Sequence, residues 1–161
     1  MSYRIFDQST FEELRSEAEA APRKRAHFNL HNSHKEPVQK VLICMLRESY
    51  IPPHYHEHRY QTELFIVLQG SVKLIIFDEN GGIQKEVAMG EGSGTSMVEI
   101  EPNVIHTIVC ESDDAFLMEV KEGPFVEEQS KVFPEWSMKE GDPEAESYLE
   151  ALRGKRGIMT C

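Results

Sequence analysis

The sequence predicts an all-β core, an antiparallel barrel or sandwich, with a helix before it and a shorter helix after it. Short runs rich in Val, Ile, Leu and Phe recur from Pro37 onward, and no helical segment separates them. Strands that follow one another in this way pair antiparallel, because parallel pairing needs long crossover connections. The chain of 161 residues, 40% hydrophobic and 28% charged, suits one globular domain.

The first element expected is an amphipathic helix. Ser9 or Thr10, followed three residues later by Glu12 or Glu13, is a capping-box signal for its start. Apolar residues then recur at helical spacing up to Pro22, namely Phe11, Leu14, Ala18 and Ala21.

The strands follow as seven short runs. They are Val38–Leu46, Glu63–Leu68, Ser71–Phe77, Ile83–Met89, Ser96–Ile100, His106–Cys110 and Ala115–Val120. Asn80, Gly81 and Gly82 tolerate positive φ, which a tight hairpin requires, so the third and fourth runs should pair. Near the end of the chain, Asp142, Pro143 and Glu144 predict the start of the second helix, and Gly154 its end.

These elements divide the chain into three stretches of one structural domain. Residues 1–36 hold the first helix and a lead-in segment, residues 37–124 the barrel, and residues 125–161 an extension with the second helix. The last residues, 155–161, are expected to form a loose tail.

Composition and charge exclude several classes of protein. A net charge of −11 disfavours nucleic-acid partners, because such binding depends on Lys and Arg neutralising phosphates. No run approaches the roughly 18 apolar residues of a membrane span, and the amino terminus resembles no secretory signal, so we expect a cytoplasmic protein without a membrane partner. The basic cluster Arg23, Lys24 and Arg25 is interpreted as a solvated helix end, with contact to an anionic substrate as the alternative.

The cysteines show no paired pattern. Cys44 and Cys110 lie inside apolar runs, and Cys161 is the last residue. We expect reduced, mostly buried thiols and no disulfide framework.

The histidines carry the main functional signal. His54, His56 and His58 alternate along one strand-like stretch, Glu63 follows, and His106 lies on a separate strand. Alternate residues of a strand face the same side, so these imidazoles point together. If they point into the barrel, their burial costs free energy unless they bind a partner, and a divalent metal is the strongest such partner. The alternative is a row of exposed loop histidines.

Two motifs resemble those of the cupin superfamily. The first runs from Pro52 through His54 and His56 to Glu63 and Gly70, and the second spans residues 99–107 with His106. The resemblance implies a cupin double-stranded β-helix, a jelly-roll-like barrel. It also implies one divalent metal held by two histidines and a glutamate of the first motif and one histidine of the second.

The first motif departs from the family in its spacing. The family leaves three or four residues between the second histidine and the glutamate, whereas His56 and Glu63 are separated by six and His58 and Glu63 by four. Either His54 and His56 bind the metal or His56 and His58 do. The Pro-Pro-His-x-His context favours the first pair and the spacing favours the second; on the context we predict the ligand set His54, His56, Glu63 and His106.

The second motif departs from the family at two positions. Glu101 stands where proline is common, and Asn103 stands where glycine is common. Asparagine is the next best residue for a left-handed turn, so we expect the turn before His106 to be kept.

The flanks at residues 22–31 and 116–125 are similar to the WbuC family of cupin-fold metalloproteins, which is associated with surface-polysaccharide gene clusters. The reaction of that family is poorly defined, but three imidazoles and one carboxylate leave a metal position open, so we expect a metal-dependent enzyme, an isomerase or dioxygenase-type cupin, acting on a small polar or sugar-related substrate. The alternative is a non-catalytic, metal-dependent binding module for a small molecule or carbohydrate. Nitrogen and oxygen ligands suit Fe, Mn, Ni or Zn, and cupins of this kind often form homodimers.

Several side chains are candidates for a supporting acid or base, although each also has an ordinary structural interpretation. They are Tyr55, Arg59, Tyr60, His27 and His31. His27, Asn29 and His31 alternate, and they would line one edge of a barrel mouth if that segment is extended. Cys110 is interpreted as a core residue, with a thiol metal ligand as the alternative.

Overall fold

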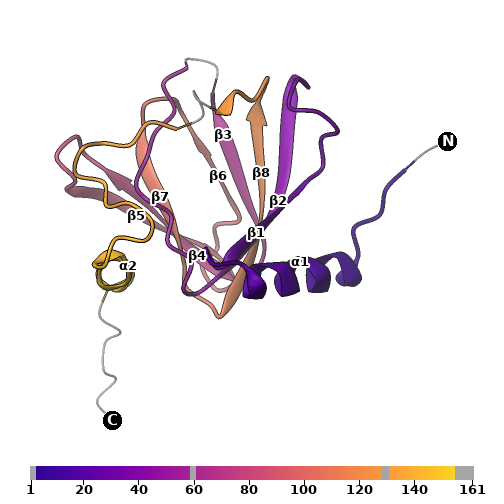
Figure 1. The fold of residues 1–161 in the computed structure, drawn as a ribbon, viewed down its shortest axis with the longest axis horizontal. Coiled ribbons are helices and arrows are strands. Elements are labelled where there is room, and N and C mark those ends of the chain that lie inside the picture. Colours follow the sequence, from indigo (N-terminus) through magenta and orange to yellow (C-terminus); the bar gives the residue numbers. More distant parts are fainter. Residues whose placement is uncertain (1–2, 59–60, 128–130, 155–161) are drawn as a thin grey trace, which may run out of the picture.

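The computed structural model describes residues 3–58, 61–127 and 131–154. In these ranges the chain forms two facing antiparallel sheets and two helices (Figure 1). The strands are β1 (Arg25–Asn29), β2 (Val38–Leu46), β3 (Glu63–Gln69), β4 (Ser71–Phe77), β5 (Ile83–Gly90), β6 (Met97–Ile100), β7 (Ile105–Cys110) and β8 (Asp114–Glu122). The helices are α1 (Gln8–Ala20) and α2 (Ala145–Arg153).

The larger sheet has the strand order β1-β2-β8-β3-β6, and the smaller sheet has the order β5-β4-β7. Every described strand pair is antiparallel. The barrel expected from the sequence is therefore confirmed, and the seven expected strands agree with β2 to β8 to within about two residues at each end.

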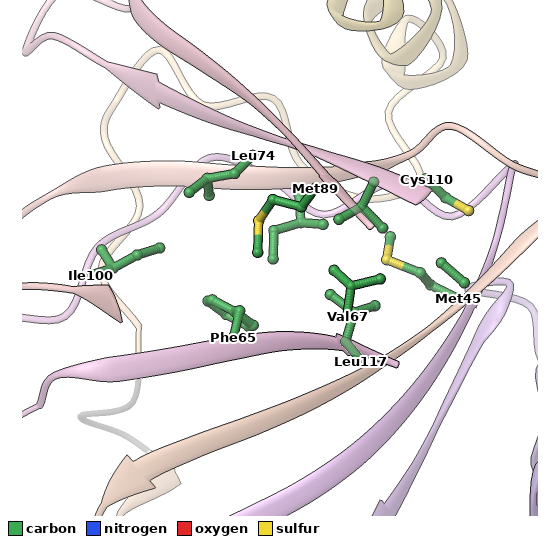
Figure 2. Packing of buried hydrophobic residues seen from close by; sticks show 11 residues of the cluster. Met45, Phe65, Val67, Leu74, Met89, Ile100, Cys110 and Leu117 are labelled. Atoms are coloured by element: carbon green, nitrogen blue, oxygen red, sulfur yellow. The ribbon is translucent and has the colours of Figure 1, made fainter. Parts of the chain in front are cut away.

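The main core lies between the two sheets. Figure 2 shows Phe65 and Val67 of β3 pointing toward Leu74 of β4 and Met89 of β5. These side chains are almost fully buried, and Met45 and Leu117 extend the same cluster. This apolar packing fixes the strands whose ends carry the polar site described below.

Each helix covers a different outer side of the barrel (Figure 1). Helix α1 packs Leu14 and Ala18 against a second apolar cluster on β1, β2 and β8 that includes Phe116. Helix α2 packs Leu149 and Leu152 against a third cluster on β4 and β7. Neither helix has the length and apolar character needed to cross a membrane.

The expected helix starts are wrong in detail. The N-cap of α1 is Asp7, whose carboxylate accepts a hydrogen bond from the backbone N–H of Ser9, and not Ser9 or Thr10. An aspartate two residues earlier serves equally well because any short acceptor at this position satisfies the first N–H groups. Helix α2 begins at Ala145 and not at Pro143, because residues 142–144 form a turn; its end at Gly154, with φ 81°, is confirmed.

The interpretation of Arg25 as part of a solvated helix end is also wrong. Arg25 opens β1, is buried, and forms an ion pair with Glu140 at 2.5 Å. Its guanidinium also donates to the backbone carbonyl of Tyr50 at 3.0 Å. Arg25 therefore ties β1 to the segment before α2.

The hairpin and the buried thiols agree with the sequence. Gly81 has φ 86° between β4 and β5, and the Asp78 carboxylate accepts hydrogen bonds from the backbone of Asn80 and Gly82. Cys44 and Cys110 are fully buried free thiols. Cys161 and the tail expected at residues 155–161 lie outside the described residues.

Candidate metal centre

The structure brings together four polar side chains at one end of the barrel interior. They are His54, His56, Glu63 and His106, and the candidate ligand atom of each lies within 4.8 Å of the others. All four are buried, with exposed fractions of 5% or less. Glu63 is the first residue of β3, His106 is the second of β7, and the other two lie in the segment between β2 and β3.

The backbone pairs His54 directly with His106. The N–H of His54 donates to the carbonyl of His106 at 3.1 Å, and the N–H of His106 donates to the carbonyl of His54 at 2.9 Å. Directly opposed residues of an antiparallel pair point to the same face. The two imidazoles accordingly lie with their ring centroids 4.7 Å apart.

His56 is held by the turn before β7. The N–H of Asn103 donates to the carbonyl of His56 at 2.8 Å. Asn103 has φ 64°, the left-handed conformation that the sequence predicted for it. This asparagine therefore makes the turn and also anchors the strand-like stretch that carries the histidines.

Glu63 sits between the histidines and Lys121. Its Oε2 atom lies 2.9 Å from Nε2 of His56 and 3.4 Å from Nε2 of His106, while Oε1 lies 3.5 Å from Nζ of Lys121. Lys121 of β8 is the residue paired with Glu63 in the sheet register, so both side chains leave the sheet on the same face. Burial opposes ionisation of Glu63, but His106, His56 and Lys121 hold the pKa of its carboxyl well below the ordinary value.

Two of the imidazoles have a defined tautomer. Nδ1 of His54 lies 2.9 Å from the carbonyl of Pro52, and Nδ1 of His106 lies 2.8 Å from the carbonyl of Val104. A carbonyl oxygen can only accept, so each Nδ1 carries a proton. Burial, the positive charge of Lys131 and the neighbouring His106 lower the pKa of His54 well below its ordinary value. The ring is therefore neutral at pH 7, and its Nε2 atom carries no proton.

These groups fit a metal ion. Nε2 of His106 and Oε2 of Glu63 are fully buried, face each other, and have no hydrogen-bond partner of acceptable geometry in the part of the chain that the structure describes. Two such atoms face each other stably only when a proton or a metal ion lies between them. Imidazoles that donate Nδ1–H to a carbonyl and present Nε2 are the usual form of metal-binding histidine. The cluster could therefore bind one metal ion.

The remaining sequence candidates lie outside this cluster. His58 is partly buried and is not among the grouped residues. Tyr55 points to the other side of its strand and lines a surface hollow with Trp136. Cys110 belongs to the apolar core, where burial raises the pKa of its thiol to about 11. Arg59 and Tyr60 fall outside the described residues.

A cavity opens next to the cluster. Its inner part, about 130 Å³, is lined by His54 and His106 and also by His27, Glu119 and Lys131. An outer part of about 220 Å³ shares the last three residues and adds His31. The alternation of His27, Asn29 and His31 along one edge of the mouth is thus confirmed, because residues 25–29 form β1.

Two lysines of the site, Lys121 and Lys131, were not predicted from the sequence. In the sequence, Lys121 follows an apolar run and does not differ from the many charged residues that are expected to be exposed. Only the register of β3 with β8 places it against Glu63. Lys131 lies in an irregular segment without periodicity. No spacing rule in the sequence could have assigned either lysine to the site.

Comparison of sequences identifies one family model. Residues 6–89, more than half of the chain, match the model described as "Domain of unknown function (DUF6016)". No curated protein matches the sequence of the chain.

Many solved structures match the fold. A protein from Shewanella oneidensis is 8% identical with a TM-score of 0.56, over 67% of this chain and 73% of that one. A recombinant oxalate oxidase in complex with glycolate is 16% identical with a TM-score of 0.53, over 71% of this chain and 57% of that one. A variant of oxalate decarboxylase from Bacillus subtilis is 18% identical with a TM-score of 0.51, over 68% of this chain and 27% of that one. The chain thus spans only part of these two enzymes, and it has the cupin fold that its motifs implied.

Proposed function

The chain belongs to the DUF6016 family, and on the chemistry of its buried cluster we propose that it is a metal-dependent enzyme acting on a small polar substrate. The proposed ligands are His54, His56, Glu63 and His106. The observation that carries the proposal is the pair of buried atoms Nε2 of His106 and Oε2 of Glu63, which face each other 3.4 Å apart and have no hydrogen-bond partner of acceptable geometry among the described residues.

An enzyme needs a coordination position that the protein does not fill. Three imidazoles and one carboxylate leave one or two positions available on a five- or six-coordinate ion. The cavity beside His54 and His106 gives a small molecule access to that side of the cluster. A metal bound there would polarise a substrate oxygen and stabilise negative charge that develops on it.

The chain's own residues would supply the surroundings. His54 and His106 would be oriented by their hydrogen bonds to backbone carbonyls, and Glu63 by Lys121. Ile51, Phe65 and Leu117 form an apolar wall of the cavity and would limit the water around a bound substrate. Fe, Mn, Ni and Zn all accept this donor set.

A sugar-related substrate and a link to surface-polysaccharide synthesis form the finer part of the proposal. Their support is the similarity of residues 22–31 and 116–125 to the WbuC family. The cytoplasmic location and the homodimer stay predictions from the sequence.

Elemental analysis tests the metal site. Untagged protein purified without chelators should contain about one metal ion per chain, and His54→Ala and His106→Ala should lose it. His58→Ala is the matched control and should keep it, because His58 lies outside the cluster. Wild-type protein that takes up none of the four metals after reconstitution would overturn the proposal.

A turnover assay separates an enzyme from a binding module. Metal-loaded protein is incubated with sugars and sugar nucleotides, and the mixtures are examined by NMR and mass spectrometry. Product that is absent with His106→Ala supports the enzyme. Saturable binding without any product would instead identify a metal-dependent binding module.

A further inference from the structure

Among the described lysine and arginine side chains that line the cavity beside the cluster, one has no carboxylate counterion. Arg23 and Arg25, which line its inner part, both form ion pairs with Glu140, at 2.8 and 2.5 Å. Lys121, which lines its outer part, lies 2.7 Å from Glu119. Lys131 lines both parts, and within the described ranges it makes no hydrogen bond and no ion pair.

The backbone directs Lys131 toward the histidines. Tyr55 and Val132 exchange two hydrogen bonds, of 3.0 and 2.9 Å, as a closely bonded antiparallel pair. Residues on either side of such a pair oppose each other on the other face of the strands. The ring of Phe133 accordingly lies 6.1 Å from that of His54, and Lys131 leaves the backbone on the same face.

The electrostatics of the cavity agree with this geometry. Desolvation by the surrounding protein atoms lowers the pKa of the Lys131 ammonium, while the carboxylates of Glu119 and Glu63 oppose the shift. The charge of Lys131 in turn lowers the pKa of His54, so the two groups interact. Lys131 is exposed at the cavity wall, so its ammonium, which has no hydrogen-bonded anion among the described residues, is accessible to an anion that enters the cavity.

The walls indicate an anion with a single charge. One ammonium is uncommitted, and the carboxylate of Glu119 lies on the same wall, where it would repel a second negative charge. The two parts of the cavity together are at the lower end of the range for small-molecule sites, about 300 to 1,000 Å³. His27, which makes no described hydrogen bond through its side chain, adds a polar group beside Lys131.

We propose that this cavity binds a small monocarboxylic acid, with its carboxylate on the ammonium of Lys131 and its remainder extending toward the His54–His106 side of the cluster. The inference rests on the proposed function, because it names the substrate class of the same site. It adds a specificity-determining residue, Lys131, that does not bind the metal.

Calorimetric titration of lactate into metal-loaded protein tests the inference. Lactamide has nearly the same shape without the charge, and inorganic phosphate carries more charge. We expect lactate to bind and lactamide and phosphate to bind at least about 10-fold more weakly, the effect of losing or mismatching one charge-assisted hydrogen bond. Lys131→Gln should weaken lactate binding by a similar factor, and Lys131→Arg should restore most of it.

Lys85→Gln is the control, because Lys85 is exposed on β5 away from the cavity. Elemental analysis and thermal unfolding of each variant show that it holds metal and is folded. The inference is overturned if metal-loaded Lys131→Gln binds lactate as wild type does, if lactamide binds as tightly as lactate, or if wild type binds no lactate. Failure of wild type to take up metal would instead overturn the proposed function, and the two failures are therefore distinguishable.

Discussion

Oε2 of Glu63 lies 3.4 Å from Nε2 of His106, and neither atom has a hydrogen-bond partner of acceptable geometry within the described parts of the chain. The other nitrogen of His106 donates to the carbonyl of Val104, so in the neutral imidazole Nε2 is an acceptor. With a neutral His106 the metal-free protein holds two acceptors against each other, and this arrangement predicts that removing the charge of Glu63 does not destabilise the metal-free protein.

Glu63→Gln should weaken metal binding and yet leave the metal-free protein at least as stable as wild type at pH 8. The amide of glutamine can donate where the carboxylate cannot, so the facing acceptors gain a proton donor. Differential scanning calorimetry with and without metal measures both effects. Metal at 100 times its Kd should stabilise wild type by about 2.7 kcal/mol and the variant far less. Metal-free Glu63→Gln that unfolds well below wild type would contradict this account.

Lys121→Met should weaken metal affinity by about 10-fold to 100-fold without removing a ligand. The ammonium of Lys121 lies 3.5 Å from Oε1 of Glu63 and 2.7 Å from Glu119. It therefore holds the Glu63 carboxylate through the oxygen that does not face the histidines. Competition with a chromogenic chelator measures the affinity. Lys85→Met serves as the control because its side chain is exposed on β5. Equal affinities of the two variants would show that Lys121 does not position Glu63.

Glu140→Gln should destabilise the protein by about 3 kcal/mol at pH 7, because it leaves the buried guanidinium of Arg25 without its counterion. Burial alone would raise the pKa of Glu140, but Arg23 and Arg25 hold it below the ordinary value of 4.5. The folded state therefore binds fewer protons than the unfolded state, and this stability is present above about pH 4.5 and is lost as the pH falls through the folded pKa.

Urea unfolding of wild type and Glu140→Gln between about pH 7 and pH 3 checks both statements. The difference in unfolding free energy between the two proteins should shrink as the pH falls. A difference that stays constant over this range would exclude Glu140 as the titrating group.

Cys44 and Cys110 should resist alkylation in the folded protein. Burial raises the pKa of the Cys44 thiol to about 12 and that of Cys110 to about 11, so little thiolate is present at pH 8. Iodoacetamide labelling followed by peptide mapping should show modification at least about 100-fold slower than in urea-unfolded protein. Rapid labelling of Cys110 in the folded state would show that the core around β7 opens readily.

The strands and the histidine-glutamate motifs could be predicted from the amino-acid sequence alone. Each strand run is short, apolar and bounded by turn residues, and Asn103 was identifiable as a left-handed turn because few other residues accept that conformation. The grouping of His54, His56, Glu63 and His106 was favoured because period-2 spacing and the motif resemblance pointed the same way. These signals are local, so they can be read without the fold.

The surroundings of the cluster depend on the tertiary structure. The choice of His54 over His58 for the cluster depends on the backbone pairing of His54 with His106, which joins residues more than fifty positions apart. Lys121 reaches Glu63 through the register of β3 with β8, and Lys131 reaches the cavity through the pairing of Val132 with Tyr55. The prediction for Arg25 was wrong for the same reason, since its counterion Glu140 lies far along the chain. Charged side chains have no periodicity that reveals their partners, and long-range pairing alone determines whether they meet solvent, a counterion or a cavity.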